Sequence, residues 1–157
     1  MSRQPRRKQL KPGAVVITVP GLLRRLAAIF YDGLLLLAVL FFATALLLPF
    51  NKGLAFTSEQ FFYPLYLILI SGLFYTWFWT HGGQTPGLRA WKMTVLTFEQ
   101  KPITWKQAVL RYIAAALSWA AFGAGFLWVF VDKNQRSWHD CLSKTALFLI
   151  TDVPPRG

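Results

Sequence analysis

The sequence is poor in cysteine and in acidic residues. Cys141 is its only cysteine, so the chain can form neither an intramolecular disulfide nor a metal site that needs two cysteines. Asp and Glu number 6 against 17 Lys and Arg, which leaves a formal net charge of +11. At the same time 55% of the 157 residues are hydrophobic, an unusual pairing for a soluble protein of this size. A membrane protein reconciles the two, because apolar residues face lipid while cations collect at the cytoplasmic leaflet.

Motifs for catalysis, nucleotide binding and metal binding are also missing. The chain has no GxSxG, P-loop or GxGxxG pattern. Its two histidines, His81 and His139, lack the HxxxH or HExxH spacing of metal ligands. The Lys and Arg residues lie outside the apolar runs, without the interleaved aromatic residues that single-strand binders use. We therefore expect no enzymatic activity, no metal, no cofactor and no nucleic-acid partner.

Three long apolar runs are present, at residues 26–50, 61–80 and 112–131. Each is long enough for a helix to cross a hydrocarbon core about 30 Å thick. The first run has a signal-peptide-like site at Ala43, Thr44 and Ala45, but its basic region is long and apolar residues continue past that site. The pattern predicts an all-α integral membrane protein with about three hydrophobic helical segments.

The third run has two interpretations. As one uncharged helix it would span the membrane and leave the C-terminus outside. A re-entrant hairpin bent within 118–125 would instead keep the C-terminus cytoplasmic. The charge rule favours the hairpin, because four cations follow the run: Lys133, Arg136, Lys144 and Arg156. On that interpretation the short run 145–150 could pair as a strand with the alternating segment 93–98, giving a small β pairing in the cytoplasmic part.

The chain divides into a basic cytoplasmic tail at 1–21, a membrane domain at 22–151 and a short C-terminal tail at 152–157. Residues 1–25 contain Lys and Arg but no acid, with Pro and Gly among them, which predicts little fixed structure. Flanking segments rich in Lys and Arg stay on the cytoplasmic side. We therefore expect a cytoplasmic N-terminus, with anionic lipids as partners of the basic tail.

Asp32 lies inside the first apolar run, about 9 Å past its start at 1.5 Å per residue. An ionised acid at that depth costs a few kcal/mol, so it should be paired, protonated or exposed to a water-filled cavity. Arg25 lies two helical turns earlier on the same face, about 10 Å away, which is too far for a direct bond without bending or a third group, so it could reach the headgroups instead. Arg111, at the mouth of the third run, is a further candidate partner. Asp32 is therefore a candidate functional residue, or else a residue that fixes helix packing through a buried pair.

Three sequence segments resemble the RDD family, a family of small polytopic membrane proteins from bacteria. They are RRLAAIFYD ending at Asp32, GQTPG from Gly83 to Gly87, and RSWHD from Arg136 to Asp140, with Thr145 following. The resemblance implies that Arg25, Asp32 and Asp140 are the arginine and two aspartates that name the family. Gln84, Thr85, Pro86, Gly87 and Arg111 match further family landmarks. Leu88 departs from the family, which usually has a lysine there.

The resemblance implies a multi-pass protein of the bacterial cytoplasmic (inner) membrane whose biochemical role is mostly undefined, with transport or cation/proton exchange suggested for some members. We hypothesise that Asp32 binds either a cation or a proton. A supporting charge network would lie at the mouth of its cavity: Arg25, Arg111, Arg136, His139 and Asp140. Thr85, Pro86 and Gly87 are expected to form a tight turn with positive φ at the glycine.

The alternative is a non-catalytic accessory or assembly protein of the membrane. Three segments can scarcely enclose a pathway alone, so transport would require a homo-oligomer or a partner membrane protein. The small residues from Gly123 to Gly125 offer a close-packing face for such a contact.

Overall fold

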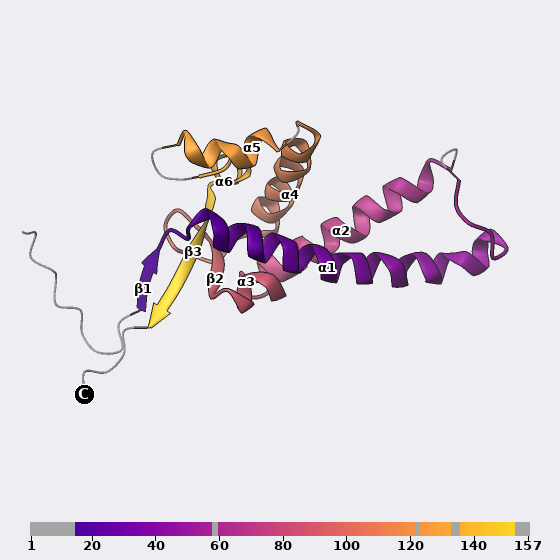
Figure 1. Cartoon of the computed structure of the whole chain (residues 1–157), viewed down its shortest axis with the longest axis horizontal. Helices are drawn as coiled ribbons and strands as arrows, with labels where there is room; N and C mark the ends of the chain where they lie inside the picture. Colours follow the sequence, from indigo (N-terminus) through magenta and orange to yellow (C-terminus); the bar gives the residue numbers. More distant parts are fainter. Residues whose placement is uncertain (1–14, 58–59, 122, 133–135, 153–157) are drawn as a thin grey trace, which may run out of the picture.

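The computed structural model describes residues 15–57, 60–121, 123–132 and 136–152 (Figure 1). In chain order the elements are β1 (Val15–Thr18), α1 (Leu22–Leu47), the 3-10 helix η1 (Leu48–Asn51), α2 (Phe62–Thr80), α3 (Pro86–Ala90), β2 (Met93–Thr97), α4 (Trp105–Ala120), α5 (Ala124–Leu127), the 3-10 helix η2 (Trp128–Phe130), α6 (Trp138–Ser143) and β3 (Thr145–Asp152).

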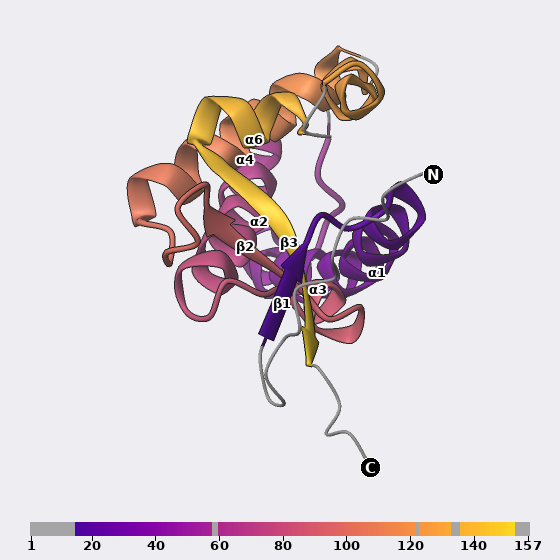
Figure 2. The ribbon, with the colours of Figure 1, turned by 90° about the vertical axis from the view of Figure 1, so that its left-hand side faces the viewer.

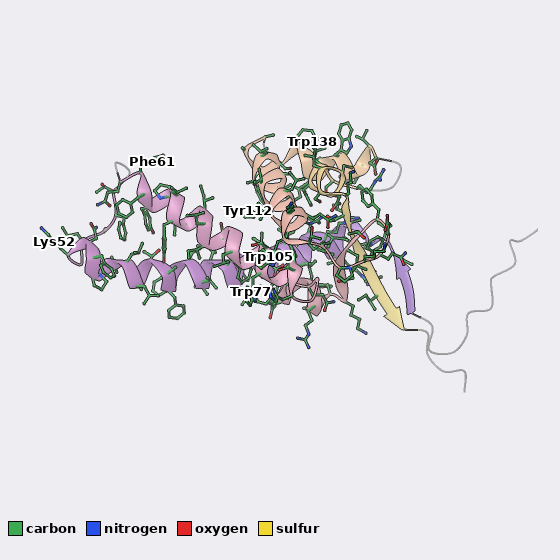
Figure 3. The ribbon with its side chains drawn as sticks, turned by 180° about the vertical axis from the view of Figure 1, so that it is seen from behind. Lys52, Phe61, Trp77, Trp105, Tyr112 and Trp138 are labelled. Atoms are coloured by element: carbon green, nitrogen blue, oxygen red, sulfur yellow. The ribbon has the colours of Figure 1, made fainter. Side chains whose placement is uncertain are left out.

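Helices α1 and α2 form a hairpin that projects from the rest of the molecule (Figure 1). Within the described residues these are the two helices long and apolar enough to cross a membrane, and only 6% of the most apolar window of each is buried. A helix in the core of a soluble protein would hide such residues, whereas a lipid-facing helix leaves them exposed. The bounds agree with the predicted runs 26–50 and 61–80 to within a few residues at each end. Figure 3 shows Lys52 and Phe61 at the tip of the hairpin, opposite the end that carries Trp105 and Trp138.

A three-stranded antiparallel sheet lies at the other end of the molecule, in the order β1-β3-β2 (Figure 2). β2 pairs with β3 from Met93 opposite Leu149 to Thr97 opposite Thr145, so the pairing expected between 93–98 and 145–150 is confirmed. β1 pairs with the far end of β3. The fold is therefore mostly helical with a small sheet, rather than all-α. β1 and the first residues of α1 lie within 1–25, the segment that was expected to have little fixed structure, and residues 1–14 of it are outside the described residues.

The third apolar run does not form one helix from 112 to 131. Instead α4 begins at Trp105, where Thr104 and Gln107 form a capping box, and it ends at Ala120. Gly123 has a φ of +79°, a left-handed conformation that interrupts helices and favours glycine, and the short α5 and η2 follow it. The expectation of a single span is therefore wrong, and the interruption lies within the stretch 118–125 that was expected to bend.

The buried core lies where α1, α3, α4 and the sheet meet, not between the two long helices. It contains Ala28, Leu88, Met93, Val95, Ile103 and Ala108. Helix α4 also packs against α2, where the Tyr112 hydroxyl lies 2.5 Å from the Ser71 hydroxyl and donates to the Ile68 carbonyl at 2.9 Å (Figure 3). The base of the hairpin is thus held by a packed domain, while the tip extends away from it.

Candidate functional site

The carboxylate of Asp32 holds the start of the short helix α3. Its Oδ2 accepts a hydrogen bond from the Thr85 hydroxyl at 2.5 Å, and its Oδ1 accepts one from the Gly87 amide at 2.7 Å. The same Thr85 oxygen caps the helix by accepting from the Leu88 amide at 3.2 Å. Asp32 is only 4% exposed. Both of its oxygens therefore have partners, and the partners are neutral groups.

Each residue of the Thr-Pro-Gly segment has a distinct structural part in this contact. Pro86 occupies the first turn of α3, where its missing N–H leaves no bond unmade. A Cβ on Gly87 would lie 2.5 Å from the Ala28 carbonyl oxygen of α1. The expected tight turn with positive φ at Gly87 is therefore wrong: the segment starts a helix, and the glycine permits close approach to α1.

The preceding residues attach this loop to the sheet. Gly83 has a φ of +70°, and a Cβ on it would lie 2.7 Å from the Thr94 hydroxyl. The Gly83 carbonyl accepts from the Val95 amide at 2.7 Å, and the Gln84 side-chain amide donates to the Met93 carbonyl at 2.8 Å. The segment from Gly83 to Gly87 thus joins Asp32 in α1 to strand β2.

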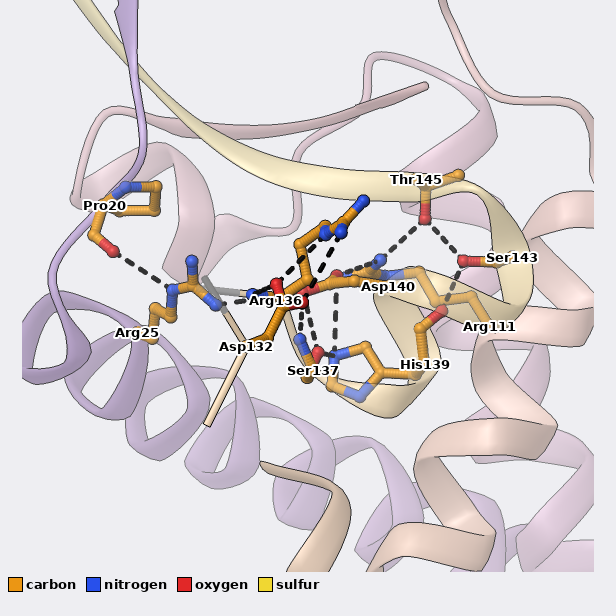
Figure 4. Close-up of polar contacts among 10 residues, drawn as sticks. All are labelled: Pro20, Arg25, Arg111, Asp132, Arg136, Ser137, His139, Asp140, Ser143 and Thr145. Atoms are coloured by element: carbon orange, nitrogen blue, oxygen red, sulfur yellow. Dashed lines mark hydrogen bonds and ion pairs between the residues drawn. The ribbon is translucent and has the colours of Figure 1, made fainter. Parts of the chain in front are cut away.

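Asp140 is the centre of a second buried cluster, shown in Figure 4. It lies at the start of α6, where its Oδ2 accepts from the Ser137 amide at 3.0 Å and from the Ser137 hydroxyl at 2.7 Å. Its Oδ1 lies 2.6 Å from Nη1 of Arg111, and its Oδ2 lies 3.8 Å from Nη1 of Arg25. All three charged side chains are at most 7% exposed. Ser137 and Asp140 form a capping box at the start of α6, and the spacing of a serine three residues before an acid is the sequence signal for this contact.

The two arginines are anchored by further contacts. Arg111 donates to the Thr145 hydroxyl at 2.7 Å, and its guanidinium lies 5.3 Å from the centre of the Trp79 ring. Arg25 donates from Nε to the Pro20 carbonyl at 3.1 Å. The cluster therefore connects α1, α4, α6 and β3, which are widely separated in the sequence.

The electrostatics of the cluster leave two cations beside one anion. Burial, followed by the nearby Arg111 charge, lowers the pKa of His139 to about 3, so this side chain is neutral at physiological pH. Burial alone would raise the pKa of Asp140, but the Arg111 charge and the hydrogen bonds from Ser137 help to lower that pKa to about 2. Asp140 is therefore ionised between Arg25 and Arg111.

Most of the site residues predicted from the sequence lie close together in the structure, but they form pairs other than the predicted ones. Arg25 and Arg111 pair with Asp140 and not with Asp32, so the expected partners of Asp32 are wrong. His139 lies beside the cluster, with Nε2 2.9 Å from the Ser137 hydroxyl. Arg136 pairs with Asp132 at 3.1 Å.

One cavity of about 530 Å³ borders Asp32 and Thr85, and it also borders Arg25, Arg111, Ser137 and His139 from the cluster around Asp140. This volume lies within the range of small-molecule sites. Its charged and titratable wall includes Arg25, Asp32, Arg111 and His139. Much of the rest is apolar or aromatic, including Ile29, Leu36, Trp79, Ala115, Ala116 and Trp119. In the described part of the chain there is no group of three or more His, Cys, Asp and Glu that could hold a metal ion.

Comparison with known proteins gives one match. The family model of the RDD family matches residues 19–144, which contain Asp32, the Gly83–Gly87 segment, Arg111 and Asp140. No curated protein and no solved structure matches the chain.

Proposed function

Because the chain belongs to the RDD family, we propose that it is an integral membrane protein that transports a small ligand or exchanges a cation for a proton through the cavity beside α1, with Asp32 as the group that binds the proton or the cation. One observation carries the proposal. Asp32 borders the cavity, and both of its oxygens hold the loop that joins the helical hairpin to the sheet. Binding of a proton or a cation to this carboxylate would therefore change its hydrogen bonds to that loop.

The membrane part of the proposal rests on the family and on the exposed apolar surface of α1 and α2. We assign the sheet to the cytoplasmic side of the bacterial inner membrane. Lys52 lies at the tip of the hairpin, whereas Arg24, Arg89, Lys92, Lys101 and Lys106 belong to the sheet end. That distribution fits the excess of Lys and Arg found in cytoplasmic loops. The basic residues before β1 would then meet anionic lipids.

The coupling step follows from competition for one carboxylate. A proton on Asp32 would remove the acceptor charge that faces Thr85 and Gly87, and a bound cation would compete with the same two donors. Either event would weaken the hold of α1 on α3. Since α3 leads directly into β2, the loop would transmit the change to the sheet.

The test is cation-induced proton movement in everted membrane vesicles, with sodium, potassium, lithium and calcium compared. Wild type should give a signal for at least one cation, and Asp32→Asn should reduce it by about tenfold or more, since the neutral amide cannot exchange a proton. Ala116→Phe, which adds a ring at the cavity wall, should also reduce it, whereas Ala120→Phe, at an exposed position of the same helix that does not line the cavity, should not. No signal for any cation from equally inserted protein would reject Asp32-coupled exchange.

A second candidate is the accessory or assembly protein. The observation in its favour is that Asp32 and Asp140 both make bonds between elements of the fold, as purely structural residues do. In that case Asp32→Asn would lower the thermal stability of the protein and its yield with a co-purifying partner. On this alternative neither wild type nor Asp32→Asn would give a transport signal.

A further inference from the structure

At one end of the cavity wall lie two positive charges, those of Arg25 and Arg111, and the acid that pairs with them, Asp140, is not itself part of the wall. Arg25 and Arg111 are 6% and 2% exposed, and Asp140 is the carboxylate within ion-pair distance of both among the residues that the structure describes. Two guanidinium groups beside one carboxylate leave a net charge of +1. An unbalanced charge in a low-dielectric site favours a counter-charge from a ligand.

The hydrogen bonds of the buried polar groups also indicate a ligand that carries an acceptor. The Nε of Arg111 is buried and has no hydrogen-bond partner within the described ranges. Asp140 Oδ1 also has no hydrogen bond of good geometry there, but it is held in the ion pair with Arg111 at 2.6 Å, and both oxygens of Asp32 accept hydrogen bonds. The charged wall therefore offers a spare donor, and a ligand must supply the acceptor.

The remainder of the cavity suits a hydrocarbon chain. The wall of α1 runs from Arg25 to Leu36, a distance of about 16 Å at 1.5 Å per residue, or about half of a 30 Å bilayer core. Leu26, Ile29 and Trp119 border the cavity and are 50%, 37% and 66% exposed, so its rim is apolar on both α1 and α4. A ligand could enter sideways from one leaflet.

We propose that the cavity binds a single-chain anionic amphiphile, with its carboxylate or phosphate head at Arg25 and Arg111 and its chain between α1 and α4. The inference rests on the proposed function, because it assigns a ligand class to the same cavity. Asp32 lies seven residues beyond Arg25 in the same wall, so its negative charge disfavours deeper entry of the head and orients the ligand.

The first experiment compares head groups on the unaltered protein in nanodiscs of phosphatidylcholine. A dansyl-labelled undecanoate probe is excited by energy transfer from the tryptophans of the protein, of which Trp79 and Trp119 line the cavity, and it is displaced by competitors. Decanoate and decyl phosphate should displace it about tenfold more effectively than decanol or decyltrimethylammonium. A tenfold difference is the change in affinity expected from one hydrogen bond to a charged group. Whichever of decanoate and decyl phosphate binds more tightly identifies the head group.

Several outcomes would overturn the inference. Equal displacement by the cationic or the neutral competitor would show that charge does not select the ligand. Equal displacement by inorganic phosphate would show that the site takes a free anion and not an amphiphile.

A variant pair tests the location of the site. Ala116→Phe should weaken probe binding about tenfold or more, as expected when a ring occupies space needed by the chain, and Ala120→Phe should leave binding unchanged. Binding unaffected by Ala116→Phe would put the probe outside the cavity and reject the inference. The proton-movement assay does not use the probe, so the two proposals can fail separately. Displacement by anionic competitors without proton movement would reject the coupling through Asp32 and leave the ligand class standing. Proton movement without a preference for anionic competitors would reject the ligand class and leave the coupling standing.

Discussion

Two aspartates are buried in the part of the chain whose burial the structure describes, and different kinds of group hold them. Asp140 lies between two guanidinium groups, whereas Asp32 accepts hydrogen bonds from a hydroxyl and a backbone amide. An ion pair fixes charge as well as position, and removing one partner leaves an uncompensated charge. Neutral donors hold a carboxylate without cancelling its charge. Of the two residues, Asp32 is therefore the better suited to exchange a proton or a cation.

The buried His139 makes stability sensitive to acid. Its pKa of about 3 is below the ordinary 6.5, so the unfolded chain takes up the proton first. The contribution of His139 to the free energy of unfolding should be fully present above pH 6.5. It should be lost as the pH falls towards 3, by at most about 1.4 kcal/mol per pH unit for one proton. Asp140, with a pKa lowered to about 2 from 3.8, adds a loss only below about pH 4.

Thermal melts of detergent-solubilised protein between pH 4 and 8 would measure this effect. His139→Gln should melt with a weaker dependence on pH than wild type, because an amide does not titrate. The matched control is His81→Gln, since His81 is exposed at the end of α2, and it should keep the wild-type dependence. An unchanged dependence in His139→Gln would assign the acid sensitivity to other groups.

At the scale of elements, the short helix α3 acts as the joint between the hairpin and the sheet. Five residues are too few for a helix to be stable alone, so its position depends on its contacts. Those contacts are the bonds to Asp32 on one side and the attachment of Gly83 and Gln84 to β2 on the other. The closeness of Gly87 to the α1 backbone determines how tightly the joint fits.

Gly87→Ala should therefore destabilise the protein by about 1–3 kcal/mol, the usual cost of inserting a methyl group into a packed contact. The new Cβ would meet the Ala28 carbonyl oxygen, a backbone atom that cannot move aside as a side chain does. Gly33→Ala is the control, because nothing lies within 4 Å of a Cβ there. Chemical or thermal unfolding of both variants in detergent would measure the difference, and equal stability would contradict the proposed joint.

At the scale of the whole molecule, the sheet determines which ends of the chain share a side of the membrane. β1 precedes the first long helix, β2 follows the second, and β3 comes near the end of the described chain. A hydrogen-bonded sheet of this size cannot be divided by a bilayer core. If α1 and α2 both span, the three strands lie on one side and the hairpin tip lies on the other.

Reporter fusions test this topology. Green fluorescent protein fused after Gly157 should fluoresce and alkaline phosphatase at the same point should be inactive, whereas phosphatase inserted after Gly53 at the hairpin tip should be active. A cytoplasmic N-terminus is measured with a fluorescent protein fused before Met1. Reporters that put the two termini on opposite sides would contradict the sheet pairing.

Much of the architecture is determined locally, and the sequence predicts that part. The two long helices follow from length and hydropathy, and the β2–β3 pair follows from alternation in 93–98 and a short apolar run at 145–150. Asp32 could be selected as unusual because an acid within an apolar run is costly wherever it lies. Arg25, Arg111 and Asp140 could be named as candidates, with the last depending on the family resemblance.

What only the tertiary structure decided is which groups meet. Arg25 and Arg111 reach Asp140 and not Asp32, a choice that depends on how α6 packs against α4 and β3. The role of Gly87 is a close contact with a carbonyl 59 residues earlier in the chain, which no local turn pattern can reveal. β1 forms because β3 offers it an edge. Hydropathy and helix length are properties of a segment, whereas these contacts are properties of pairs of segments brought together by folding.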